Sequence, residues 1–271
     1  MRSKAAWCGV LILAGVILWI LWGNKALVVT SVSVFSEKLP EGFRGFRILQ
    51  VSDLHNDTFG PDNQRLLDAV REANPDIVVI TGDAVDSYDP DPSIAIRFVR
   101  QVSQIAQVYF VPGNHEARLA CYPELRRALR ACGAVVLENE TITLSRKDDT
   151  IALSGVMDPD FHAEETETVL RHLGRENRYT VLLAHRPELF EAYAEHGFDL
   201  VLAGHVHGGQ FRLPLVGGLF APDQGWFPKY DSGLYTENGC TMVVSRGLGN
   251  SSFPFRLNNR PELILVELTG K

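Results

Sequence analysis

Acidic residues, histidines and one asparagine form five short motifs whose composition suits metal binding. These motifs are Asp53-Leu54-His55, Gly82-Asp83, Gly113-Asn114-His115-Glu116, His185 and Gly204-His205-Val206-His207. Imidazole nitrogens and carboxylate oxygens are the ligands that proteins offer to transition-type divalent ions such as Mn, Fe and Zn. The chemistry that these residues predict is therefore the binding of divalent metal ions.

Each motif stands directly after a short apolar run that is typical of a buried strand. The runs are FRILQVS (46–52), DIVVI (76–80), VYFV (108–111), YTVLLA (179–184) and DLVLA (199–203). In α/β sheets, ligands bind in the crevice beyond the carboxyl ends of the strands. Residues i and i+2 of a strand face the same side, so Asp53 and His55, like His205 and His207, can reach one site. Glycine in three of the motifs permits the sharp turns that re-aim the next side chain.

Taken singly, these motifs are weak evidence. Asp-x-His, Gly-Asp and Gly-Asn-His also fit ordinary turns, and two histidines at strand spacing are only moderately unusual. The five together are hard to explain as turn or surface residues, because every strand end in the set carries metal-ligand chemistry. We therefore predict one shared metal site.

The elements that must position these motifs alternate between strands and helices. Helical spacing extends over Asn63–Ala73, Ser93–Ala106 and Glu164–Leu173. Further strand candidates are Ala134–Leu137, Ile142–Leu144, Thr150–Ser154, Cys240–Ser245 and Leu263–Leu268. The alternation predicts an α/β fold with covered sheet faces, and roughly ten strands make two packed sheets plausible. Leu213–Tyr235 is rich in glycine and proline and is expected to form a long ordered loop.

The N-terminal segment is apolar enough to anchor the chain in a membrane. Ala5–Trp22 carries no charge, and about 18 helical residues span about 27 Å, close to the thickness of a bilayer core. We predict an N-terminal transmembrane anchor at 1–24, a tether at 25–44 and one globular domain at 45–271. The alternative is a cleaved signal peptide, because small residues follow the apolar segment.

The charges beside the apolar segment predict its orientation. Arg2 and Lys4 precede it, whereas only Lys25 follows closely. Positive charge stays on the cytoplasmic side. The globular domain is therefore expected outside the cytoplasm.

Composition restricts the classes of partner. The 271-residue chain has a formal net charge of −7, so nothing indicates a broad nucleic-acid surface, which needs a basic face. A small anionic substrate is compatible with this charge if metal ions supply the local positive charge. Of the four cysteines, Cys121 and Cys132 flank a predicted helix and lie too far apart for a disulfide. We expect all four to be unpaired, buried thiols.

The order and spacing of the motifs resemble those of the calcineurin-like metallophosphoesterase family. The resemblance covers about residues 45–268, and each ligand-bearing motif of that family has a matching residue here. It implies a four-layer αββα sandwich, with two mixed sheets between helices. The GHVHGGQ sequence (204–210) and the anchor are similar to the membrane-associated bacterial branch, which includes hydrolases of the UDP-diacylglucosamine type.

The resemblance also implies a role for each motif residue. It implies two divalent ions (Mn, Fe or Zn), one held by Asp53, His55 and His207, the other by Asn114, His185 and His205, with Asp83 bridging both. The implied catalytic residues are His115, Asp83 and Asn114, and His115 would act without ligating a metal. A hydroxide shared by metals roughly 3.5–4 Å apart would attack phosphorus in line, and His115 would assist the leaving oxygen. Glu116 either orients His115 or is an exposed carboxylate.

The substrate is predicted less sharply than the reaction. The protein Ser/Thr phosphatase branch of the family has an arginine after the second aspartate of GDxxD, whereas Ser87 follows Asp86 here. This favours phosphodiester or pyrophosphate bonds, and the anchor favours a lipid-linked or nucleotide-containing substrate at a membrane. The alternatives are a phosphodiesterase of cyclic nucleotides or other soluble substrates, and a non-catalytic metal-binding scaffold.

Two properties stay open in the sequence. A hydrolase of lipid precursors would work on the cytoplasmic face, which conflicts with the placement that the flanking charges predict. The sequence predicts no oligomeric state.

Overall fold

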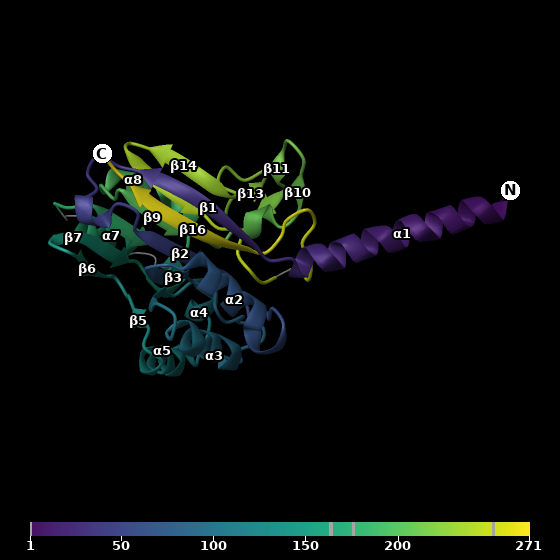
Figure 1. Cartoon of the computed structure of the whole chain (residues 1–271), viewed down its shortest axis with the longest axis horizontal. Coiled ribbons are helices and arrows are strands. Elements are labelled where there is room, and N and C mark those ends of the chain that lie inside the picture. Colours follow the sequence, from purple (N-terminus) through teal and green to yellow (C-terminus); the bar gives the residue numbers. More distant parts are fainter. Residues whose placement is uncertain (1, 163–164, 175–176, 251–252) are drawn as a thin grey trace.

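Two six-stranded sheets form the body of the molecule, and one long helix projects from it (Figure 1). The computed structural model describes residues 2–162, 165–174, 177–250 and 253–271. Strands predicted from the five apolar runs are all present, and they divide between the two sheets.

The first sheet carries three of the five motifs. Its strands, in spatial order, are β1 (Val28–Phe35), β16 (Glu262–Thr269), β2 (Arg47–Val51), β3 (Ile77–Thr81), β4 (Gln107–Val111) and β5 (Val135–Val136). Because β2, β3 and β4 are parallel neighbours, their carboxyl ends meet at one edge of the sheet. Asp53, Asp83 and Asn114 therefore emerge side by side.

The second sheet carries the remaining two motifs. Its strands, in spatial order, are β14 (Gly233–Glu237), β15 (Cys240–Val244), β9 (Leu200–Ala203), β8 (Thr180–Leu183), β7 (Asp149–Gly155) and β6 (Glu140–Arg146). The pair β8 and β9 is parallel, so His185 and His205 leave the sheet at the same edge.

Helices cover the outer face of each sheet, which gives the four-layer αββα sandwich that the resemblance implied. An apolar cluster joins the first sheet to α2 (Gln64–Ala73), α3 (Ser93–Val102) and α5 (Tyr122–Ala131). Another joins the second sheet to α7 (Thr166–Leu173) and α8 (Phe190–Glu195). A third lies between the sheets, where Val79 and Val111 of the first pack with Leu153 and Val181 of the second. Two further short helices are α4 (Asn114–Ala117) and α6 (Pro159–His162).

Apolar spacing explains why the outer helices form where they do. In α2 the buried side chains are Leu66, Leu67, Val70 and Ala73, which share one face of a helix with 3.6 residues per turn. The helix predicted at Glu164–Leu173 is α7, although residues 163–164 lie outside the described residues.

The predicted tether at 25–44 is wrong, because its residues 28–35 belong to the first sheet. Residues 28–35 form β1, which pairs in parallel with β16 from Val28 opposite Glu262 to Phe35 opposite Thr269. Exposure alternates along VVTSVSVF, with Val28, Thr30, Val32 and Val34 the less exposed, which suits an edge strand with one face on the core. The globular domain thus begins at β1, well before residue 45.

Helix α1 (Arg2–Lys25) projects from the domain without packing on it, except at its last turn (Figure 1). Its stretch Trp7–Lys25 is long and apolar enough to cross a membrane. At the base of the helix, Asn24 exchanges two hydrogen bonds with the backbone of Arg256, at 2.9 and 2.7 Å. These contacts fix the helix to the domain.

The predicted long loop at Leu213–Tyr235 contains more regular structure than expected. Two small antiparallel hairpins occupy it, β10 (Arg212–Leu213) with β11 (Gly217–Gly218), and β12 (Phe220–Ala221) with β13 (Gly225–Trp226). Its end enters β14. The strands are too short for their alternation to be detected in the sequence. The four cysteines are free thiols, as expected, but Cys240 alone of the four is buried, whereas Cys121 and Cys132 are half-buried and Cys8 is exposed.

Candidate metal centre

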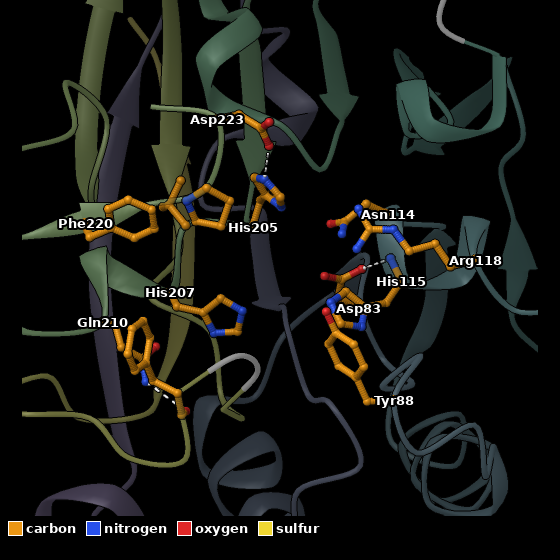
Figure 2. Close-up of a pocket in the computed structure, with 13 residues that line it drawn as sticks. Asp83, Tyr88, Asn114, His115, Arg118, His205, His207, Gln210, Phe220 and Asp223 are labelled. Carbon is orange, nitrogen blue, oxygen red and sulfur yellow. Dashed lines mark hydrogen bonds and ion pairs between the residues drawn. The ribbon is translucent and has the colours of Figure 1, made fainter. Parts of the chain in front are cut away.

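The predicted ligands converge in one crevice between the ends of the two sheets. The residues concerned are all buried: Asp53, His55, Asp83, Asn114, His185, His205 and His207. Figure 2 shows Asp83, Asn114 and His115 facing His205 and His207 across a pocket. Side chains separated by up to about 150 residues in the chain are thus brought together, as the strand ends predicted.

The backbone that presents these side chains is strained. Asp53, His55, Asp83, His205 and His207 all have positive φ, at 51°, 44°, 53°, 70° and 47°. Non-glycine residues rarely adopt this region, and such strain persists where the surrounding structure over-determines it, commonly at functional sites. The crevice is also too crowded for a side chain at Gly204, where a Cβ would lie 1.9 Å from Ser52 Oγ.

Asp53, His55 and His207 form the first group of potential ligands. One ligand atom from each lies within 4.8 Å of the others, and His207 Nε2 is 3.7 Å from Asp53 Oδ1. Both ring nitrogens of His55 are buried without a hydrogen-bond partner among the described residues. Burial lowers the pKa of His55 to about 3 and that of His207 well below its usual value. The His55 imidazole, with both nitrogens unpaired, therefore fits a metal ion better than a protein hydrogen bond.

Asp83, Asn114, His185 and His205 form the second group. His185 Nε2 lies 3.1 Å from Asp83 Oδ2 and 3.0 Å from Asn114 Oδ1. Burial opposes charge on both His185 and Asp83, but their attraction prevails: it raises the pKa of His185 to about 10 and holds that of Asp83 well below its usual range. His185 Nε2, Asp83 Oδ2 and Asn114 Oδ1 thus lie close together, and one nitrogen and two oxygens are a donor set that suits a divalent cation.

Asp83 stands between the two groups. Its Oδ2 atom is 3.1 Å from His185 Nε2 in the second group and 3.5 Å from His55 Nε2 in the first. Its other oxygen accepts a hydrogen bond from the His115 backbone at 2.9 Å. The carboxylate therefore has one oxygen directed at the space that the two groups share.

His115 lies at the edge of the pocket with a defined tautomer. Its Nδ1 accepts a hydrogen bond from the Ser87 backbone N–H at 3.0 Å, and Ser87 Oγ and Asp86 Oδ1 are 3.0 and 3.2 Å away. Because a backbone N–H can only donate, Nδ1 offers its lone pair and Nε2 carries the proton of the neutral ring. The ring meets that of His55 edge to face, with centroids 4.5 Å apart.

Glu116 does not orient the His115 ring, nor is it exposed. It is fully buried and accepts hydrogen bonds from three backbone N–H groups, those of Asp83, Val85 and Gly113, at 2.8, 3.1 and 2.8 Å. Burial and the charge of Asp83 raise the pKa of Glu116 to about 7. Its carboxylate ties the loop after β3 to the loop after β4.

Three further residues support the site without belonging to any motif. Asp223 Oδ2 lies 2.9 Å from His205 Nε2. The buried Arg256 guanidinium donates to the carbonyl oxygens of Gly249 and Arg246 and lies 3.2 Å from His207 Nδ1. Arg186 pairs with Asp158 at 2.7 Å and also with Asp223, the partner of His205.

The pocket in front of the ligands has a polar and an apolar wall. Its volume is about 240 Å³, and it is lined by Asp83, Asn114, His205 and His207 on the side of the ligands. Phe220, Pro222, Phe253 and Tyr88 contribute apolar surface. A ligand with an anionic head and an apolar or aromatic group would match both walls.

Comparison with known proteins agrees with this geometry. The family model for calcineurin-like phosphoesterases matches residues 46–209, which include all five motifs. The chain belongs to this family. It is therefore a metallophosphoesterase, a hydrolase of phosphate esters, as the resemblance in its motifs implied.

Several relatives are similar over most of this chain. The uncharacterized metallophosphoesterase YkuE of Bacillus subtilis is 30% identical over 88% of this chain and 84% of its own length. Phosphodiesterase YaeI of Escherichia coli is 30% identical, covering 82% of each. A transmembrane protein with metallophosphoesterase domain from Danio rerio is 32% identical over 89% of this chain but 57% of its own length. Family membership and a binuclear His/Asp centre are thus supported from both sequence and structure.

Proposed function

We propose that the chain hydrolyses phosphodiester or pyrophosphate bonds at a centre that holds two divalent metal ions. The observation that carries this proposal is the position of Asp83, whose Oδ2 lies within 3.5 Å of ligand nitrogens from both groups. A carboxylate that serves two adjacent sites is what a binuclear centre requires.

The proposed ligands follow the two groups. Asp53, His55 and His207 would hold one ion; Asn114, His185 and His205 would hold the other; Asp83 would contact both. The unpaired nitrogens of His55 and the convergent donors around His185 support this assignment. When bound, two such ions supply Lewis acidity and positive charge that activate water and neutralise the phosphoryl oxygens. Nitrogen and carboxylate donors favour Mn, Fe or Zn over Mg or Ca.

His115 is the proposed general acid. With Nδ1 accepting the Ser87 N–H, the ring presents its Nε2 proton, which it can donate to the leaving oxygen. Asn114 would act through its amide oxygen as a ligand and through its amide N–H groups on a phosphoryl oxygen. Asp83 would contact both ions and keep the two groups of ligands next to each other.

The substrate class rests on three observations. Ser87 stands where the protein phosphatase branch has arginine, so a phosphomonoester dianion lacks that cationic partner. The apolar wall of the pocket suits a second substituent on phosphorus. A relative named phosphodiesterase supports the same class. We propose a lipid-linked or nucleotide-containing substrate.

Residues 1–24 would anchor the enzyme in a membrane, with the catalytic domain outside the cytoplasm. The long exposed helix α1 supports an anchor, as does the name of the transmembrane relative. Reporter fusions after residue 271 test the side: activity of a reporter that works only in the cytoplasm would contradict the outside placement.

The decisive experiment compares the full chain with Asp83→Asn on bis(p-nitrophenyl) phosphate, with Mn²⁺ added or chelated. We expect metal-dependent turnover that falls at least about 10³-fold in the variant, because one bridging carboxylate serves both ions. Asp91→Asn, an exposed aspartate whose carboxylate bonds Ser93 at the start of α3, is the matched control. Metal analysis of each protein accompanies the assay. Turnover that persists in Asp83→Asn, or no bound metal in the native chain, would contradict the proposal. Turnover of p-nitrophenyl phosphate above that of the diester would reject the diester preference.

A further inference from the structure

Large apolar side chains are exposed on one side of the domain. The hairpin β10–β11 carries Leu213, Leu215 and Val216, which are 43%, 108% and 57% exposed, and Phe253 and Phe255 beside it are 46% and 40% exposed. These five residues are called the apolar rim below. Soluble proteins rarely cluster such side chains on a surface that faces only water.

The apolar rim lies on the side of the domain from which α1 projects (Figure 1). Phe211 joins its two parts, because the ring packs against Phe253 and Phe255, with centroids 5.4 and 5.3 Å apart. The next residue along, Arg256, is bonded through its backbone to Asn24 at the base of α1. The rim and the end of the helix therefore form one fixed surface.

Cationic and indole side chains gather at the base of the helix. A hollow of about 250 Å³ there is lined by Trp19 and Trp22 of α1 and by Arg246 and Arg260 of the domain. Arg260 also stacks over the Trp22 ring at 5.2 Å. Tryptophan and arginine at the end of an apolar helix are the residues that occupy the level of lipid headgroups. The chain as a whole has a net charge of −7, whereas Arg246, which also pairs with Glu262, and Arg260 place positive charge at this junction.

We propose that the apolar rim inserts into the same bilayer that α1 crosses, with Arg246 and Arg260 at the level of the lipid phosphates. This inference rests on the membrane anchor of the proposed function and deepens it. Phe253 belongs both to the rim and to the wall of the catalytic pocket. The pocket therefore opens at the membrane surface, and the favoured substrate is a phosphate ester whose apolar part stays in the bilayer.

Fluorescence quenching in lipid nanodiscs tests the insertion directly and needs no catalysis. The full chain, with its four native cysteines replaced by alanine, carries one bimane label at Leu215→Cys, Phe35→Cys or Leu13→Cys. Phe35 is the matched control, because it is 59% exposed but lies at the end of β1 remote from α1. Nanodiscs contain phosphatidylcholine and phosphatidylglycerol, with nitroxide either near the headgroup or at the chain end.

We expect the label at 215 to be quenched by the shallow nitroxide and shielded from aqueous iodide, and the label at 35 to show the reverse. The label at 13 reports the anchor, and deep quenching is expected there. Deep quenching at residue 13 with none at residue 215 would contradict insertion of the apolar rim while supporting the anchor. No quenching at 13 overturns the anchor, and with it this inference. Shielding from iodide at 215 without lipid quenching, in discs that hold two copies, shows a second copy on the rim and also overturns it.

A kinetic comparison separates the rim from catalysis. The double variant Leu215→Asp, Val216→Asp changes residues outside the pocket. Turnover of hexadecyl p-nitrophenyl phosphate in the nanodisc is expected to fall about tenfold, because charged tips oppose insertion. Turnover of soluble bis(p-nitrophenyl) phosphate should stay within about twofold, and Phe35→Asp should change neither. Equal loss on both esters, or loss on neither, contradicts the rim; absence of turnover in the native chain contradicts the proposed hydrolase instead.

Discussion

The two halves of the site are held in place by buried side chains of opposite charge. Glu116 supports the half that follows β3 and β4, and it touches only backbone N–H groups. Arg256 supports the half that follows β9, and its guanidinium reaches the ring of His207 itself. Neither makes an ion pair among the interactions that the structure describes. The half that follows β3 and β4 is thus ordered through its backbone loops. The half that follows β9 is ordered through a contact with the proposed ligand His207.

Because the two supports contact different parts of the site, their loss should have different effects. Loss of the loop support should affect folding first, because three buried N–H groups lose their acceptor. Loss of the ligand support should affect metal affinity first, because a partner of a ligating histidine fixes its ring and tautomer. If His207 ligates through Nε2, Nδ1 carries the proton and donates to Gly249 O, which lies 3.3 Å away. Arg256 then shares that carbonyl with the ring.

The largest effect is expected for Glu116→Ala. The three N–H groups of Asp83, Val85 and Gly113 would be left in a buried place, and each unsatisfied donor costs about 1–3 kcal/mol. We expect the free energy of unfolding to fall by at least about 3 kcal/mol, which lowers Tm by roughly 6–12 °C. Thermal unfolding of the metal-free full chain in detergent measures this. Glu124→Ala, an exposed carboxylate on α5, should change Tm little; equal shifts in both would refute the loop support.

Next in size is Arg256→Met, which keeps the bulk of the side chain but removes its donors. The group of Asp53, His55 and His207 should lose about 10–100-fold in metal affinity, whereas the other group should keep its affinity. Metal content after dialysis against graded Zn²⁺ buffers would show one ion released early and one retained. Arg260→Met, which bonds the backbone at Ala26 and Leu27 but no ligand, is the control. Simultaneous loss of both ions would break the comparison.

A smaller effect is expected for Asp223→Asn, which changes the partner of His205 in the half that follows β9. Asp223 contacts His205 from a half-exposed position, so water can replace part of its interaction. We expect kcat/KM for bis(p-nitrophenyl) phosphate to fall about tenfold, with unchanged Tm. Asp231→Asn changes a carboxylate just before β14 that accepts a hydrogen bond from Gly218 instead and should leave kcat/KM as it is. A fall in both variants would point to hairpin disorder as the cause.

The smallest effect is expected for Ser87→Ala, in the half that follows β3 and β4. His115 Nδ1 keeps the Ser87 backbone N–H when the hydroxyl is removed, so the tautomer persists. We expect kcat to fall about threefold and KM to stay the same. His115→Ala should cost about 10²–10⁴-fold. A Ser87→Ala loss as large as that of His115→Ala would mean that the hydroxyl, rather than the backbone, orients the ring.

The first half of the site was the more predictable from the sequence. Its support lies inside the motif, because Glu116 stands two residues after Asn114, and all its ligands end apolar runs. Even there the motif left open what Glu116 does, since the three N–H groups that it binds come together only when β3 and β4 pair. The fold class followed from the same runs, because buried parallel strands have a strong apolar signal.

The residues that support the half after β9 could not be recognised in the sequence. Asp223 and Arg256 reach their histidines across 18 and 49 residues, and neither stands at a strand end. Short hairpins hide Asp223 in a segment that reads as a loop, and an arginine in FPFRLNN is not distinguishable from a surface cation. The strand β1 was missed for a related reason, since its alternation of valine and serine is that of an edge strand and its partner lies at residues 262–269.

The pairing of β1 with β16 sets the order of events during synthesis. Strand β1 is an edge strand, and β16 separates it from β2, so residues 28–35 have no partner in the sheet until residues 262–269 have left the ribosome. If α1 enters the bilayer first, β1 waits at the membrane surface with its edge open while the intervening chain folds. Chains stalled before residue 262 should therefore be cut by protease within residues 28–35, and chains stalled far enough beyond residue 269 to expose β16 should be protected. The first sheet is thus completed only after synthesis of residues 262–269, when β16 pairs with β1.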